Sequence, residues 1–198
     1  RLGFVYTDTG AMYRAIGLAA VRLGVDTTDA KGVESILDDV EVSISHNESG
    51  QQIFLNGENV SEEIRLPEIS VAASNVAVIP KVRLKLVELQ RKLAEKTDVI
   101  MDGRDIGTYV LPDAEVKIFL TASSEERAKR RLKELVEKGV ETTFEEVLSD
   151  MESRDKNDSG REFAPLRAAE DSIEFDNTEI TLLDAVNKIC EMVKGRVG

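Results

Sequence analysis

The sequence contains no tryptophan, one cysteine and one histidine among its 198 residues. The single cysteine, Cys190, excludes an intrachain disulfide and a metal site built from several thiolates, and this usage fits a cytoplasmic protein. His46 stands in the turn-like string HNESG, so we expect a plain turn residue and no metal site. No apolar run reaches the ~18 residues of a membrane span, and no signal peptide is recognisable. We therefore expect no membrane partner.

Positive charge is outnumbered, since 26 Lys and Arg residues against 38 Asp and Glu residues give a formal net charge of −12. A strongly acidic protein is a poor nucleic-acid binder, since binding requires many cations on one face. The arginines nevertheless fall in short, distinctive strings. An acidic protein that binds an anion must concentrate positive charge locally, so these strings indicate where an anionic ligand would bind.

Hydrophobic residues make up 41% of the chain and aromatic residues 5%, which predicts an aliphatic core in one compact α/β body, with room for a small appended lobe. Strand-like and helix-like segments alternate along the chain, which indicates a parallel sheet wrapped by helices. The expected strands lie at 2–8, 98–102, 116–120 and 172–176. The expected helices lie at 11–23, 29–40, from Pro67, 80–96, 123–139, 143–155 and from Thr181.

Residues 41–60 are an exception to this pattern. Polar and apolar residues alternate there, and Asn56-Gly57 is a strong signal for a hairpin turn whose central residues need a positive φ. We expect a small antiparallel sheet inserted into a helical lobe.

The string DTGAMYR (8–14) follows an expected strand and opens a helix. Ligands bind open α/β sheets at that edge. Asp8 or Thr9 can cap the helix, and Arg14 can point back over the strand ends. A capped helix with a surface arginine explains this string equally well.

The string DGRDIGT (102–108) also follows a buried strand. Arg104 can direct two donors at a phosphate or carboxylate, and Asp105 can accept a hydrogen bond from an amino group on a base. The density of charged residues and glycines favours a functional turn over a local ion pair.

Two further strings are weaker by themselves. SRDKNDSGR (153–161) predicts a mobile polar loop, and its residues Arg154, Asp158 and Arg161 would suit a lid over an anion. In SNVAVIPKVR, Ser74 and Arg83 flank a joint between two helices.

Taken together, DTGAMYR, DGRDIGT, the arginine-containing lid followed by APL, and the antiparallel insert resemble the bacterial cytidylate kinase family of nucleoside monophosphate kinases. The resemblance covers essentially the whole chain. It implies a P-loop kinase core with a monophosphate-binding lobe and a short lid. It also implies transfer of the γ-phosphoryl group of ATP, as a complex with Mg²⁺, to CMP or dCMP by a monomeric enzyme.

The resemblance assigns roles to nine residues. It implies that Thr9, Arg14 and Arg104 lie at the acceptor phosphate and that Ser74, Arg83 and Asp105 read cytosine. It further implies that Arg154 and Asp158 reach the sugar, and that Arg161 approaches the phosphates as a catalytic lid residue together with Arg154. Arg127, Arg130 and Arg131 follow an expected strand, and for them a role at the site and a solvated helix face remain open.

The same resemblance divides the chain into three parts. The core comprises 1–8, 98–152 and 168–198, the monophosphate-binding lobe comprises 9–97, with the antiparallel insert at about 40–61, and the lid comprises 153–167. The lid departs from the family's pattern in having Asn157 and Ser159 where charged residues are common.

A phosphate-binding string G-x-x-x-x-G-K-[ST] does not occur in the sequence. In the family this string precedes the segment that opens here, so we expect the natural protein to carry it before Arg1. Two alternatives remain: a non-catalytic module that binds a nucleoside monophosphate, and a related small kinase with another acceptor such as UMP.

Overall fold

A computed structural model describes residues 1–48 and 50–197 of the chain. The chain forms two compact units, residues 3–106 and residues 107–198 with the first two residues. The division into core, lobe and lid stays a prediction.

A short parallel ladder organises the first unit. Strand β1 (Val5–Asp8) pairs with β5 (Val99–Asp102), so that Asp8 lies opposite Asp102 at the carboxyl ends of both strands. The unit also contains helices α1 (Gly10–Arg22), α2 (Ala30–Ile36), α3 (Pro67–Val76) and α4 (Pro80–Ala94), with short 3₁₀ turns at Leu37–Asp39 and Glu63–Arg65. Pro67 and Pro80 each begin a helix, where their missing N–H leaves no hydrogen bond unmade.

Helix α1 is the centre of the apolar core of this unit. Met12, Ala15 and Ile16 are fully buried. A β-carbon on Gly17 would lie 2.9 Å from the Ala73 backbone nitrogen, so glycine is what allows α1 and α3 to approach this closely.

The antiparallel insert is present as predicted. It consists of β2 (Val42–Asn47), β3 (Gly50–Leu55) and β4 (Glu58–Asn59), in the order β2–β3–β4. Asn56 and Gly57 have φ values of 49° and 81°, which confirms the predicted turn. The expectation that His46 is a plain turn residue is wrong. The pairing between β2 and β3 continues as far as Asn47 and Gly50, so His46 belongs to a strand.

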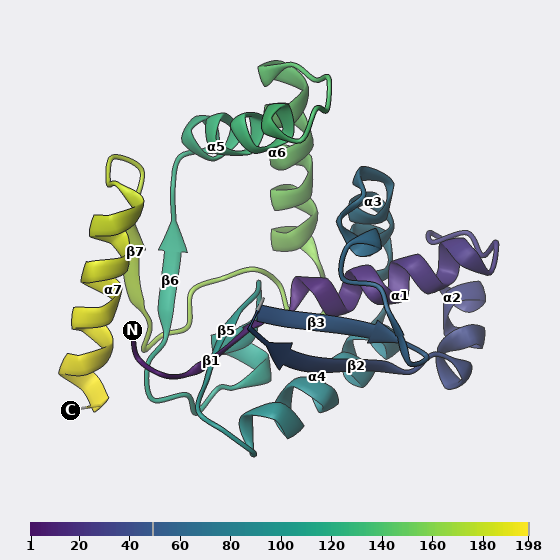
Figure 1. Ribbon diagram of the computed structural model, residues 1–198, viewed down its shortest axis with the longest axis horizontal. Coiled ribbons are helices and arrows are strands. Elements are labelled where there is room, and N and C mark those ends of the chain that lie inside the picture. The colour runs from purple at the N-terminus through teal and green to yellow at the C-terminus, as the bar shows by residue number, and fades with distance from the viewer. Residues whose placement is uncertain (49, 198) are drawn as a thin grey trace. The chain divides into compact units, whose positions relative to one another are not determined.

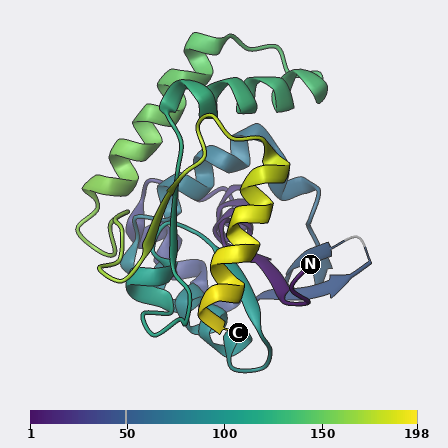
Figure 2. The ribbon, with the colours of Figure 1, turned by 90° about the vertical axis from the view of Figure 1, so that its left-hand side faces the viewer.

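The second unit contains another parallel ladder, between β6 (Ile118–Thr121) and β7 (Ile173–Asp176). A π-helical segment (Ile106–Val110) joins the two units along the chain. Helix α5 (Ser124–Glu137) begins at Ser123, and the capping box of Thr143 and Glu146 begins α6 (Phe144–Gly160). Figure 2 shows α5 and α6 lying against each other before the chain returns to β7 and α7 (Leu182–Val197).

These elements confirm the predicted fold class, parallel strands flanked by helices with a small antiparallel sheet (Figure 1). No helix within the described part of the chain is long and apolar enough to cross a membrane.

Candidate acceptor-nucleotide site

The two predicted strand-end turns lie side by side in the first unit. The Thr9 hydroxyl donates a hydrogen bond of 2.6 Å to the Asp102 carbonyl, although the two residues are 93 positions apart. Asp8, rather than Thr9, caps α1, because its carboxylate accepts a hydrogen bond from the Ala11 N–H at 3.1 Å. A β-carbon on Gly103 would lie 2.6 Å from the Thr9 hydroxyl oxygen, so the second turn requires glycine at this position.

Negative charge accumulates where these turns meet. Burial and the neighbouring Asp8 carboxylate raise the pKa of Asp102, while Tyr6 and Arg104 act in the opposite direction. Burial and Asp102 raise the pKa of the Tyr6 phenol, which bonds to the Asp102 carboxylate. Arg104 therefore lies close enough to Asp102 to interact with it electrostatically.

Tyr6 and Arg65 lie outside all four of the charged strings in the sequence. Arg65 lies close enough to Tyr6 to favour its ionised form, and its Nε donates to the Ser61 carbonyl at 3.2 Å. A tyrosine in a strand and an arginine in a 3₁₀ turn carry no motif signal, so only the fold brings them to the site.

Two predicted cytosine readers are in direct contact. The Arg83 guanidinium and the Asp105 carboxylate form an ion pair whose side chains are only 1% and 7% exposed. Arg83 also donates to the Ala77 carbonyl at 3.0 Å, and its guanidinium carbon lies 5.6 Å from the centre of the Tyr13 ring. These contacts hold a donor and an acceptor next to each other, almost closed to solvent.

Ser74 and Arg14 are half-buried residues of α3 and α1. Gly17 allows the two helices to approach closely, which brings the helix that carries Ser74 against the helix that carries Arg14. The first unit thus contains all six residues that were predicted to bind the phosphate and the base: Thr9, Arg14, Ser74, Arg83, Arg104 and Asp105.

The predicted lid residues belong to the second unit, and their local structure differs from the expectation. Residues 153–160 form the end of α6, so the prediction of a loop there is wrong. The capping box begins this helix, and the chain folds back to satisfy its last turn. The Leu166 N–H donates to the Asp158 carbonyl at 2.8 Å, and Arg161 Nε donates to the same carbonyl at 3.2 Å.

Arg154 is exposed on α6, whereas the Arg161 side chain is 5% exposed and lies 3.5 Å from the Asp158 carboxylate. The Phe163 ring packs edge-on against Tyr109, with 4.9 Å between ring centres. The Arg161 side chain is therefore held against the end of α6, where the chain turns back, and does not extend into solvent.

The three arginines of α5 are bound within the second unit. Arg127 pairs with Asp155 of α6 at 2.6 Å, and Arg131 pairs with Glu134 on its own helix. Arg130 donates to the Asn177 side chain at 3.1 Å. All of these contacts lie within the second unit.

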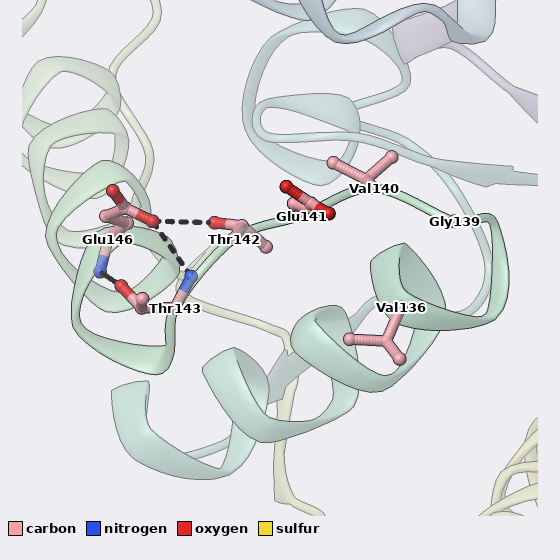
Figure 3. Close-up of a pocket in the computed structure, with 7 residues that line it drawn as sticks. All are labelled: Val136, Gly139, Val140, Glu141, Thr142, Thr143 and Glu146. Carbon is pink, nitrogen blue, oxygen red and sulfur yellow. Dashed lines mark hydrogen bonds between the residues drawn. The ribbon is translucent and has the colours of Figure 1, made fainter.

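A hollow of about 610 Å³ lies at the connection between α5 and α6, far in sequence from both motifs (Figure 3). Its lining includes Val136, Val140 and the capping box of Thr143 and Glu146. Figure 3 shows the Glu146 carboxylate turned onto Thr142 and the Thr143 N–H, where it satisfies the start of α6. None of the predicted site residues lines this hollow.

Parallel strands flanked by helices, with charged turns at the strand ends and a small antiparallel sheet, match the fold of an α/β nucleoside monophosphate kinase. The family model described as cytidylate kinase matches residues 1–195. The chain belongs to the cytidylate kinase family.

Several curated relatives carry the name cytidylate kinase. The protein from Caldicellulosiruptor saccharolyticus is 48% identical over 198 residues, which are 100% of this chain and 88% of that protein. The protein from Bacillus subtilis is 48% identical over 191 residues, 96% of this chain and 85% of that protein. The protein from Lactobacillus johnsonii is 48% identical over 193 residues, 98% of this chain and 84% of that protein.

Proposed function

We propose that this protein transfers the γ-phosphoryl group of ATP to CMP or dCMP, giving CDP or dCDP. Membership of the cytidylate kinase family supports this activity. Within the structure, the observation that carries the proposal is the buried contact between Arg83 and Asp105.

This pair suits the hydrogen-bonding edge of cytosine. Cytosine presents an amino group beside the acceptors N3 and O2, so a carboxylate suits the first and a guanidinium or hydroxyl suits the others. Asp105 would accept from the amino group, while Arg83 and Ser74 would donate. Uracil has an acceptor in place of the amino group, and Asp105 would then face another acceptor.

The acceptor phosphate is assigned to the start of α1 and to the turn after β5. Thr9 and Arg14 come from the first motif, and Arg104 comes from the second. A guanidinium can direct two parallel donors at phosphate oxygens, which makes arginine well suited to this position.

The lid assignment follows the family resemblance. Arg154 and Asp158 would contact the sugar, and Arg161 would stabilise charge on the transferring phosphoryl group. Phosphoryl transfer depends on alignment and electrostatic stabilisation, so no nucleophilic side chain is required.

The donor is proposed to be ATP with Mg²⁺ as a cosubstrate complex. Mg²⁺ in such sites takes one or two carboxylates in addition to phosphate oxygens. Asp8 and Asp102, opposite each other at the ends of β1 and β5, have the oxygen chemistry for this. We further propose a cytoplasmic monomer that acts on small molecules and binds neither membranes nor nucleic acid.

Calorimetric titration with CMP, UMP and ATP, combined with a coupled assay for CDP formation, tests the proposal. We expect CMP to bind more tightly than UMP and to be phosphorylated. Equal binding of CMP and UMP would remove the cytosine assignment. Binding of CMP without turnover in the presence of Mg·ATP would favour the non-catalytic module instead.

A further inference from the structure

The outer edge of β1 is covered by side chains of the antiparallel insert. The Val5 N–H donates to the Asp98 carbonyl and the Thr9 N–H donates to the Asp102 carbonyl. The backbone N–H and C=O groups of the odd-numbered residues in β1 therefore point toward β5. In an extended strand the backbone groups of alternate residues point to opposite edges. The backbone groups of Tyr6 and Asp8 therefore face away from β5, toward the insert.

Gln51 takes the place of a strand partner at that edge. Its side-chain oxygen accepts from the Asp8 N–H at 2.6 Å, and its side-chain nitrogen donates to the Asp8 carbonyl at 3.0 Å. His46 lies opposite Gln51 in the pairing of β2 and β3, and its Nε2 lies 2.8 Å from the Tyr6 carbonyl oxygen. Figure 1 shows this end of β3 beside β1.

Asp8 is the residue at which β1 changes into α1. Its carboxylate caps α1 through the Ala11 N–H. Thr9, the next residue, is bound to the Asp102 carbonyl. Gln51 thus holds both backbone groups of Asp8, two residues before the start of α1, the helix that carries Arg14.

We propose that Gln51 is a positioning residue for the acceptor phosphate: through Asp8 it aligns Thr9 and Arg14 with the phosphate group. The inference rests on the proposed function, since it assumes that these two residues hold that phosphate. It assigns a role to the antiparallel insert, which in this way aligns a site built on β1 and α1.

The adjacent residue Gln52 provides a matched control. It has the same side chain and lies on the same strand, but it accepts from Asn59 at 3.1 Å and so bonds within the insert rather than to β1. Gln51→Met and Gln52→Met each remove an amide while keeping a side chain of similar length. A difference between the two variants therefore isolates the contact with Asp8.

Dissociation constants are measured for CMP and for cytidine, which lacks the phosphate. Comparing the two separates a loss of phosphate alignment from a general loss of the binding site. We expect Gln51→Met to weaken CMP binding about tenfold, the magnitude of two lost hydrogen bonds, and to leave cytidine binding unchanged. Gln52→Met should leave both constants near those of the wild type. Hydrogen exchange of the Asp8 amide should increase in Gln51→Met alone.

Unchanged CMP binding in Gln51→Met, or equal losses for CMP and cytidine, would overturn the inference. Should Gln51→Met fail to fold, Gln51→Glu serves instead. It keeps the oxygen that faces the Asp8 N–H and loses the donor to the carbonyl. A wild-type protein that binds CMP no better than cytidine would contradict the proposed function itself, which is a separate result.

Discussion

The guanidinium of Arg83 and the carboxylate of Asp105 pair in a part of the first unit that is almost closed to solvent. Two opposite charges that are buried together stabilise each other, and removing one leaves the other uncompensated. Any change at Asp105 therefore acts on base recognition and on folding together, and the experiment must separate them.

Asp105→Ala is expected to lose discrimination between CMP and UMP, because the acceptor for the amino group of cytosine is gone. We expect the ratio of kcat/KM values for the two substrates to fall by on the order of 100-fold or more. The companion variant Asp105→Asn preserves the shape and supplies an N–H that can bond to uracil, so it should shift the ratio toward UMP. Unchanged selectivity in both variants would remove Asp105 from base recognition.

Arg161→Ala is expected to reduce turnover far more than stability. An arginine that places its positive charge against the transferring phosphoryl group is worth about 10³-fold or more in kcat. The comparison variant is Lys138→Ala, which breaks an exposed ion pair with Glu134 and should change neither kcat nor Tm appreciably. Near-normal turnover in Arg161→Ala would contradict the lid role.

Gly17→Ala is expected to destabilise the protein by roughly 1–3 kcal/mol, because the new methyl group meets the backbone of α3. Gly195→Ala is the control, since it also lies within a helix but its β-carbon would meet nothing within 4 Å. That control should stabilise α7 by about 0.5–1 kcal/mol. Urea unfolding measures both, and a loss of stability in Gly195→Ala as large as in Gly17→Ala would refute the packing argument.

The pH dependence of stability should reveal Asp102. Its pKa is raised above the ordinary value of 3.8, chiefly by burial and by Asp8, so the folded state binds its proton more tightly than the unfolded state. The contribution of Asp102 to the free energy of unfolding therefore falls as pH rises from about that ordinary value through the raised pKa of Asp102 in the folded state. Asp102→Asn cannot ionise and should be more stable than the wild type at neutral pH. The advantage should shrink as pH falls through this window, and an advantage that is independent of pH would contradict this cause.

The sequence was sufficient to predict the elements whose signals are local. Pro67 and Pro80 begin helices, Asn56-Gly57 makes the turn, and Thr143 with Glu146 caps α6. The end of α6 was mispredicted because Asn157, Ser159 and Gly160 are weak helix formers. The Leu166 N–H stabilises this end of the helix by donating to the Asp158 carbonyl, and helix propensities of the residues in the helix do not include such a contact.

The contacts of the site were harder to predict for the same reason. The strand-end motifs indicated that Thr9 and Arg104 belong to one edge of a sheet, and the structure brings their turns together. The roles of Tyr6, Arg65 and Gln51 depend on contacts across tens of residues, for which a single sequence carries no periodic signal. The assignments of all six residues to the base and the phosphate remain predictions.

The hydrogen bond between Thr9 and Asp102 joins residues 93 positions apart, and the whole antiparallel insert lies between them in the chain. Contacts at such sequence separation form slowly, because a long loop must close before they contribute. We therefore expect the proposed acceptor site to be among the last features of this unit to assemble. Recovery of CMP binding during refolding would lag behind recovery of helix content, so the nucleotide itself serves as a reporter of completed folding.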